Sequence, residues 1–254
     1  MVDGSRPDRP TDTLPHSMAQ TLTRTRSRST PSKPPRDEAG LVDLFIESLP
    51  RTLPCRADND WKICREMAVG RSIADVVAFP WVEFTDSLRP LSTPECVVLA
   101  YLRNFGPTRT DILERRLGWS KKCIRQDLLE ALAAQSLISF GSGGRVSLRR
   151  FRPWPSELWA FEAKLARWQE ALDQARAYQR YADRAFVVLP LATSSAACRN
   201  LSSFRSAGVG LILVDRGRAT VVLRARRSSE HDWRREFALS RLSQTGDTTR
   251  TSGK

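Results

Sequence analysis

The stretch ELWAFEAKLARWQEALDQARAYQRYADRAFVVLP, residues 157–190, decides the fold that the sequence predicts. It is expected to form a strand, a long amphipathic helix and a second strand of the buried, parallel type. Glu162 and Lys164 are two residues apart on the first strand, so their side chains project from the same face of the sheet. A carboxylate and an ammonium group together at a strand end are suited to a metal and phosphate site.

A second carboxylate is expected from the hairpin predicted over residues 61–84. Two apolar runs flank Gly70-Arg71-Ser72, and Pro80 interrupts or ends the second strand. Asp75 is a lone carboxylate in an apolar run, which is costly to bury unless it is paired or binds a cation. The alternative is an edge-strand aspartate that faces water.

A helix predicted over residues 40–50 precedes this hairpin and is expected to stop at Pro50. Its apolar residues fall at helical spacing, and Glu47 lies beside that apolar face. A solvated glutamate is the default interpretation of Glu47. Residues 1–40 are rich in Pro, Ser, Thr and Arg, which predicts a disordered basic tail.

Residues 91–150 have a different character, with three predicted helices followed by two short strands around a glycine-rich turn. This order resembles a winged helix-turn-helix, in which the start of the third helix faces the DNA major groove. The residues that would contact DNA are Lys121, Lys122, Arg125, Gln126, Arg145 and Arg149. Winged helices also dock proteins, and that alternative stays open.

The segments after residue 190 complete the predicted layout. A helix over residues 195–208 and two strands joined by a turn at Asp215 follow the second strand, and a helix and polar tail begin at about residue 227. The predicted division is therefore a tail (1–40), a core in two parts (41–90 and 151–226), an inserted winged helix (91–150) and a C-terminal helix with a tail (227–254).

Charge and cysteine usage restrict the class of protein. The chain has 41 basic and 28 acidic residues, a formal net charge of +13, which favours a polyanionic partner, most often nucleic acid. Arginine-rich composition without a ligand is the alternative. Five scattered cysteines favour a reducing, cytoplasmic setting and disfavour a zinc site. No apolar stretch approaches 18 residues, so neither a membrane span nor a secretory signal is expected.

The order helix, hairpin with a strand aspartate, E-x-K strand, helix and strand resembles the PD-(D/E)xK nuclease superfamily, which has the restriction-endonuclease-like fold. Residues 73–77 and 161–165 carry this resemblance. Gln174 and Tyr178 are similar to the Q-x-x-x-Y signature of exonuclease-type members, and Glu47 would be the acidic residue of the early helix. The resemblance implies an α/β fold whose mixed sheet is flanked by helices, with the winged helix inserted and both termini disordered.

One departure from the family is the spacing, because Asp75 and Glu162 lie 87 residues apart (162 minus 75). The predicted winged helix fills that gap, and an insertion at a hairpin tip is tolerated when its two ends lie close together. Glu83 and Asp86 remain the alternative carboxylates.

The resemblance implies a Mg²⁺ or Mn²⁺ ion held by Asp75 and Glu162. Lys164 would position or deprotonate the attacking water and stabilise charge on the phosphate, Gln174 would orient the substrate or Lys164, and Tyr178 would stack or pack. The alternative for Glu162 and Lys164 is a salt bridge on a solvated strand, worth under about 1 kcal/mol.

The function expected from these features is Mg²⁺-dependent hydrolysis of phosphodiester bonds in duplex DNA. One alternative is a catalytically silent DNA-binding transcriptional regulator, and another is a protein-docking subunit of a DNA repair or defence complex. The sequence leaves a homodimer open.

Overall fold

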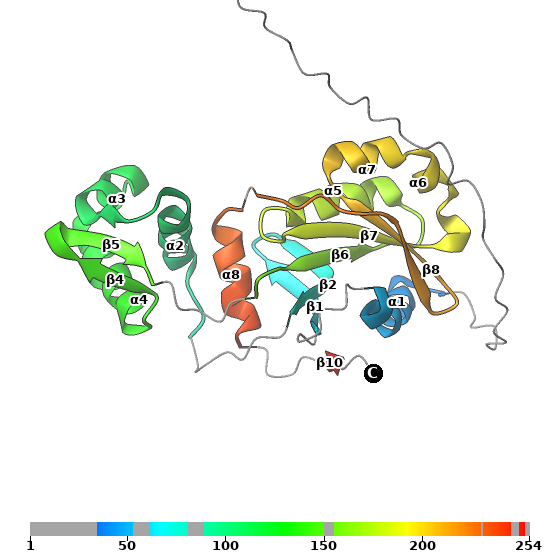
Figure 1. The fold of residues 1–254 in the computed structure, drawn as a ribbon, viewed down its shortest axis with the longest axis horizontal. Coiled ribbons are helices and arrows are strands. Elements are labelled where there is room, and N and C mark those ends of the chain that lie inside the picture. The colour runs from blue at the N-terminus through cyan, green and yellow to red at the C-terminus, as the bar shows by residue number, and fades with distance from the viewer. Residues whose placement is uncertain are drawn as a thin grey trace, which may run out of the picture. The chain divides into compact units, whose positions relative to one another are not determined.

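A mixed β-sheet with helices on both faces forms the larger part of the computed structural model (Figure 1). The structure describes residues 35–52, 61–80, 89–149, 155–229, 231–244 and 249–251. In these residues the sheet has seven strands in the order β10-β1-β2-β6-β7-β8-β9. The strands are β1 (Trp61–Val69), β2 (Ser72–Pro80), β6 (Trp159–Ala163), β7 (Arg184–Pro190), β8 (Gly210–Asp215), β9 (Arg218–Leu223) and β10 (Thr249–Thr251).

The three central strands β6, β7 and β8 are parallel, whereas β2 pairs with β6 and β8 with β9 in antiparallel fashion. Parallel neighbours need a crossover connection. Helix α5 (Trp168–Tyr178) supplies it between β6 and β7. The 3₁₀ turn Leu191–Thr193 and helices α6 (Ser195–Arg199) and α7 (Leu201–Ala207) supply it between β7 and β8.

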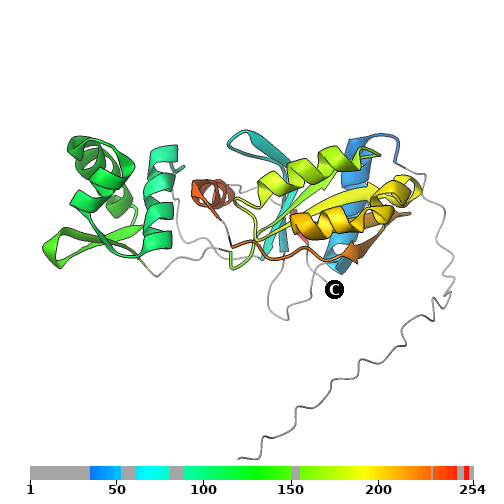
Figure 2. The same cartoon turned by 90° about the horizontal axis from the view of Figure 1, so that it is seen from above.

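Alternating side chains of the central strands fill two hydrophobic layers, one on each face of the sheet. Phe161 and Phe186 face helix α1 (Glu38–Thr52), whereas Val187 and Leu211 belong to the layer under α5 and α7. Figure 2 shows α1 and the α5–α7 group on opposite sides of the strands. Burial on both faces explains why the sequence of β7 reads as one apolar run.

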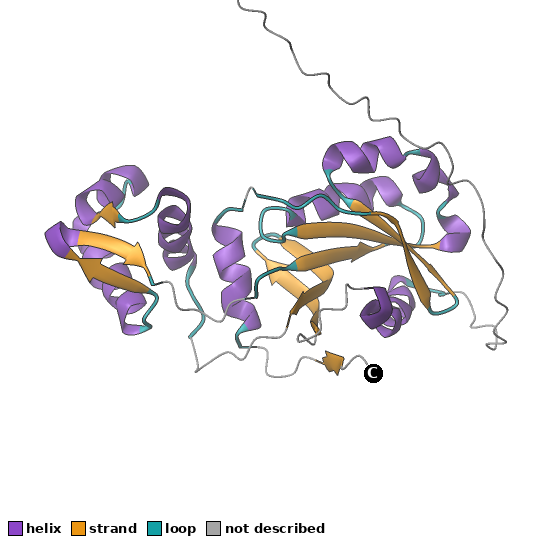
Figure 3. Ribbon diagram, in the orientation of Figure 1, coloured by secondary structure: helices purple, strands orange, loops and turns teal. Residues whose placement is uncertain are grey.

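Residues 89–149, here called the inserted module, form their own hydrophobic cluster of helices around a three-stranded sheet (Figure 3). The helices are α2 (Thr93–Phe105), α3 (Thr110–Leu117), a π-helical segment (Cys123–Leu129) and α4 (Glu130–Ala134). The strands, in the spatial order β3-β5-β4, are β3 (Thr108–Arg109), β5 (Arg145–Leu148) and β4 (Ile138–Gly141).

The inserted module interrupts the chain between two strands that are neighbours in the large sheet. Ala78 near the end of β2 pairs with Trp159 at the start of β6. The chain therefore leaves the sheet and returns to it at adjacent positions, which is the geometry that an insertion requires.

Helix α8 (Trp233–Leu242) contributes to both hydrophobic cores. Its Ala238 and Leu242 belong to the core of the large sheet, whereas Trp233 and Phe237 pack against the core of the inserted module. Glu236 is buried and forms an ion pair with Arg103 of α2. Helix α8 therefore packs between the large sheet and the inserted module and joins their hydrophobic cores.

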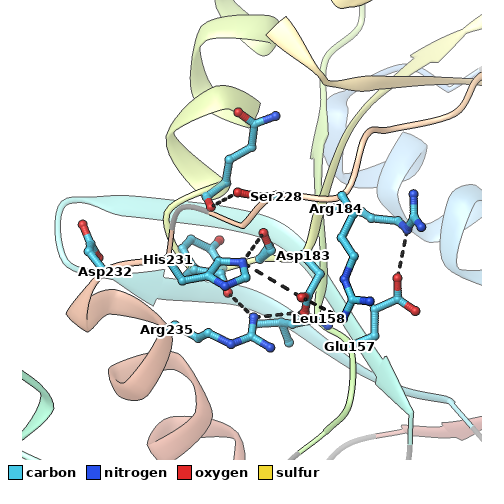
Figure 4. A network of polar contacts seen from close by, with 12 residues as sticks. Glu157, Leu158, Asp183, Arg184, Ser228, His231, Asp232 and Arg235 are labelled. Atoms are coloured by element: carbon cyan, nitrogen blue, oxygen red, sulfur yellow. Dashed lines mark hydrogen bonds and ion pairs between the residues drawn. The ribbon is translucent and has the colours of Figure 1, made fainter. Parts of the chain in front are cut away.

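A buried aspartate, Asp183, ties the start of β6 to the segment before α8 (Figure 4). Its carboxylate accepts hydrogen bonds from the Leu158 N–H (2.8 Å) and from Arg235 Nη1 (3.0 Å). The Asp183 carbonyl accepts from the Ser228 N–H at 2.8 Å. Burial and the adjacent Arg235 guanidinium lower the pKa of His231, which lies in the same network. We assign this cluster a structural role because its buried polar atoms satisfy one another.

The structure confirms the coarse prediction of an α/β fold with a mixed sheet flanked by helices. No helix within the described ranges is long and apolar enough to cross a membrane. The predicted tail over residues 1–34 and the alternative carboxylates Glu83 and Asp86 lie outside the described residues.

Four details of the predicted layout differ from the structure. Helix α1 begins at Glu38, inside the predicted tail, because the Asp37 side chain accepts the Gly40 N–H at 2.7 Å and caps the helix. The helix also continues past Pro50 to Thr52. A proline lacks a backbone N–H, and in the last turn this removes a single hydrogen bond of the helix.

The predicted single helix near residues 195–208 is two helices, because Asn200 has non-helical dihedral angles (φ −111°, ψ 31°) between α6 and α7. The predicted C-terminal tail contains a strand, since β10 pairs with β1 through Thr251 and Trp61.

Candidate active site

The candidate site lies where β2 and β6 separate. Their antiparallel ladder runs from Ala78/Trp159 to Val76/Phe161. Beyond that pair, Asp75 Oδ2 accepts the Ala163 N–H at 2.8 Å, so a side chain takes the place of a backbone partner. On the other edge of β6 the Lys164 N–H still donates to the Val188 carbonyl at 3.1 Å. The ladder of β6 is thus interrupted on the β2 side only.

Glu162 is the most deeply buried acid of the site, with 2% of its surface exposed. Its Oε1 lies 3.0 Å from Lys164 Nζ. Its Oε2 is in contact with the Tyr178 hydroxyl, which also lies 2.6 Å from the Ile73 carbonyl oxygen. A phenol has one proton, so it cannot donate to both acceptors at once. The hydroxyl of Tyr178 therefore donates its proton either to Glu162 or to the Ile73 carbonyl at any one time.

The pKa values of both carboxyl groups of the site, Glu162 and Asp75, are raised. Burial raises the pKa of Glu162, and the nearby Asp75 raises it further, against the lowering effects of Tyr178 and Lys164. Burial also raises the pKa of Asp75, although the Ala163 N–H and Lys164 oppose the shift. Both acids are therefore short of compensating positive charge, which a bound cation would supply.

Lys164 stays charged in this surrounding. Burial by itself would lower the pKa of Lys164, but its hydrogen bonds and attraction to Glu162 and then Glu38 outweigh burial, and the pKa is raised. Nζ lies 3.2 Å from Glu38 Oε2 of helix α1. An ammonium group held between two carboxylates serves as a donor and a fixed positive charge, and a raised pKa makes it a poor base.

The residues present fit a hard divalent cation of the Mg²⁺ class. Mg²⁺ is commonly bound through one or two carboxylates and keeps several waters, and Asp75 and Glu162 offer that number of ligands. No group of three or more His, Cys, Asp or Glu side chains that could hold a metal occurs among the described residues. A site built on these two acids therefore depends on water and substrate oxygens for its remaining ligands.

Two of the predicted catalytic residues lie away from this cluster. Glu47 is exposed on α1, nine residues after Glu38 (47 minus 38), which is about 13 Å along the helix. The acid of α1 that contacts Lys164 is Glu38, and the catalytic role of Glu47 stays a prediction. Gln174 is exposed on α5 and makes no hydrogen bond to Lys164 within the described residues. That Gln174 orients the substrate or Lys164 stays a prediction.

Sequence reasoning missed Glu38 and the hydrogen bond from Tyr178 to Glu162. The signal for Glu38 was the aspartate before it, because Asp37 is a residue type that caps helix N-termini. The Tyr178 contact follows from the α5–β6 packing, which the sequence order alone does not specify.

The residues predicted to contact DNA lie on the surface of the inserted module. The exposed ones are Lys121, Lys122, Arg125, Gln126, Arg145 and Arg149. Arg125 forms an ion pair with Glu114 at 3.0 Å, which neutralises part of its charge. Lys121 and Lys122 come just before the π-helical segment, at the start of the third helical region.

Comparisons with known proteins add little to this geometry. No family model matches the chain, and no curated protein matches it. One solved structure, of a protein of unknown function from Silicibacter pomeroyi, is similar with 20% sequence identity and a TM-score of 0.27. The match covers 45% of this chain and 76% of that chain. We infer neither fold nor function from it.

Proposed function

We propose that this protein is a Mg²⁺-dependent DNA nuclease of the PD-(D/E)xK type, with a restriction-endonuclease-like core and an inserted winged helix. The observation that carries the proposal is the meeting of Asp75 with Glu162 and Lys164, which the sequence separates by 87 residues or more. Phosphodiester hydrolysis needs such residue types, and they lie together where β2 and β6 separate. They are the carboxylate of Asp75, the buried acid Glu162 and the buried ammonium group of Lys164.

A bound Mg²⁺ ion supplies Lewis-acid activation of the phosphate and a nucleophilic water at neutral pH. Asp75 and Glu162 would hold that ion, and the hydrogen bond from the Ala163 N–H fixes the Asp75 carboxylate in place. Tyr178 orients Glu162 from the opposite side. Lys164 positions the water and stabilises negative charge on the phosphate, because its raised pKa disfavours a role as the base.

Glu38 is the further acid of this proposed site. Its contact with Lys164 fixes the ammonium group from the α1 side and sets its direction. We class Glu38 as a positioning residue, since its contact is with Lys164 rather than with the reacting atoms.

The inserted module is the proposed DNA-docking element. Three helical regions and a small sheet in this order support the winged-helix interpretation, as do the exposed Lys121 and Lys122. Direct base contacts would come from the start of the third helical region.

A catalytically silent DNA-binding scaffold is the second candidate. The observation that favours it is the closed chain of ion pairs from Glu38 through Lys164 to Glu162, which satisfies the ammonium group without substrate. Under this alternative the wild-type protein binds DNA but never cuts it.

Incubation of the purified protein with supercoiled plasmid and with linear duplex, in Mg²⁺ and in chelator, separates the two. We expect cleavage in Mg²⁺ alone. Glu162→Gln and Lys164→Met should each lower the rate by about a hundredfold or more while DNA binding persists. The control is Glu170→Gln, an exposed acid of α5 paired with Arg167, which should cut like the wild type. Cleavage that survives both site variants would refute the assignment.

A further inference from the structure

A cavity of about 370 Å³ lies between the β1–β2 turn, the end of α5 and the start of α8. Four arginines line it, together with Ser72, Gln179 and one acid, Asp173. The arginines are Arg71 in the turn, Arg176 in the last turn of α5, Arg180 two residues after that helix, and Arg234 in α8. The turn lies against α8, since a Cβ added at Gly70 would come 3.4 Å from Arg234 Nε. We call this cavity the arginine pocket.

Three of these guanidinium groups have no carboxylate partner among the described residues. Arg71, Arg176 and Arg180 are exposed, and no ion pair joins them to another residue in the part of the chain that the structure describes. Arg234 differs, because it pairs with Asp232 and lies over the Trp233 ring at 4.8 Å. Like charges around one concave surface repel, and an anion relieves that repulsion.

The arginine pocket is connected to the candidate active site through two elements. Ser72 starts β2, three residues before Asp75, which is about 10 Å along a strand. Arg176 precedes Tyr178 by two residues on α5. A phosphate group bound in the arginine pocket would therefore lie a few nucleotides along the DNA strand from the phosphate at the metal site.

We propose that the arginine pocket binds a phosphate group of the DNA substrate and thereby sets the position of the strand relative to Asp75 and Glu162. Guanidinium groups bind phosphate through paired, charge-assisted hydrogen bonds, which a cluster of lysines would not reproduce. This inference rests on the proposed function, which names DNA as the ligand. The phosphate is either an internal diester or a terminal monoester at a 5′ end.

The test is the affinity for a fluorescent duplex of about 25 base pairs, measured by anisotropy without Mg²⁺ so that cleavage does not intervene. The variant Arg71→Gln/Arg176→Gln/Arg180→Gln is compared with Arg199→Gln/Arg205→Gln/Arg218→Gln. The control arginines are also exposed and have no ion pair to another described residue, so both variants lose the same charge.

We expect the pocket variant to bind about tenfold more weakly, with a slope of log affinity against log salt smaller by about 0.9, the value for one lost phosphate contact. The control should change affinity by less than about twofold. A loss larger for 5′-phosphorylated than for 5′-hydroxyl duplex assigns the pocket to a terminal phosphate, and an equal loss assigns it to an internal one.

Equal behaviour of the two variants, or a wild type that does not bind duplex, would overturn the inference. The two proposals fail separately. If the wild type binds as expected but never cuts in Mg²⁺, the nuclease proposal fails and the pocket stands. If it cuts but the pocket variant binds like the control, only the pocket inference fails.

Discussion

Replacement of Lys164 by methionine removes the ammonium group that compensates Glu162 while it keeps most of the side-chain volume. Glu162 is 2% exposed and Lys164 is 9% exposed, so water does little to screen their interaction. Removal of one partner of a buried ion pair costs about 3 kcal/mol when the other partner stays charged. Glu38 adds less than about 1 kcal/mol because its side chain is 43% exposed.

The cost of Lys164→Met should depend on pH, with a sign fixed by the pKa of Glu162. The pKa of Glu162 is raised in the folded protein. The contribution of Glu162 to the free energy of unfolding is therefore fully present below its pKa in the unfolded chain, and it is lost as pH rises through its pKa in the folded protein. Lys164 opposes this rise, so its removal raises the pKa of Glu162 further and enlarges the loss at high pH. The raised pKa of Lys164 keeps the ammonium contribution present until well above pH 8.

Urea unfolding at pH 4 and pH 8, followed by tryptophan fluorescence, measures this difference. We expect Lys164→Met to lower the free energy of unfolding by about 3 kcal/mol at pH 8 and by less than about 1 kcal/mol at pH 4. The exposed Lys122→Met is the control and should stay within about 0.5 kcal/mol of the wild type at both pH values. An equal loss at the two pH values, or a larger one in acid, would refute the reasoning.

Three further predictions concern other parts of the molecule. Tyr178→Phe should lower the free energy of unfolding by about 1–3 kcal/mol. Because Tyr178 lowers the pKa of Glu162, the same variant should shift the acidic limb of the pH–rate profile of Mg²⁺-dependent cleavage to higher pH. An unshifted profile would argue against the contact. Lys121→Gln/Lys122→Gln/Arg125→Gln should weaken duplex binding and its salt dependence, whereas unchanged anisotropy titrations would favour protein docking by the inserted module. Asp183→Asn should lower the free energy of unfolding by about 3 kcal/mol, measured in urea, since it leaves Arg235, whose side chain is 12% exposed, without its carboxylate partner; a loss under about 1 kcal/mol would contradict the structural role.

Strand alternation put Glu162 and Lys164 on one face, the apolar run around Asp75 singled out that residue, and the order of the predicted elements linked the three into one candidate site. A lone charge in an apolar run is costly to bury, so it stands out in the sequence when the strand is internal. The structure brings all three to the divergence of β2 and β6, and the pairing of Val76 with Phe161 sets the register.

Glu38 was beyond that reasoning because two local patterns compete. The proline-rich and arginine-rich composition before residue 40 predicts a tail, whereas the Asp37 cap starts a helix inside it. Its contact with Lys164 joins residues 126 positions apart, and such a tertiary pair leaves no periodic pattern in the sequence.

The arginine pocket was hidden for the same reason, since its members come from a turn and two helices that are distant in the sequence. The break at Asn200 and the short strand β10 also depend on packing rather than on periodicity. Local chemistry thus predicted the strands of the core, and tertiary contacts determined what surrounds the site.

The central claim is that Asp75 and Glu162 bind one divalent cation between them, on which the nuclease proposal depends. Anomalous diffraction from crystals soaked in Mn²⁺ measures this directly. We expect an anomalous difference peak within about 2.2 Å of a carboxylate oxygen of each residue. The peak should disappear in Glu162→Gln. An intact Glu162–Lys164 ion pair with no peak at the β2–β6 divergence, in crystals saturated with Mn²⁺, would contradict it.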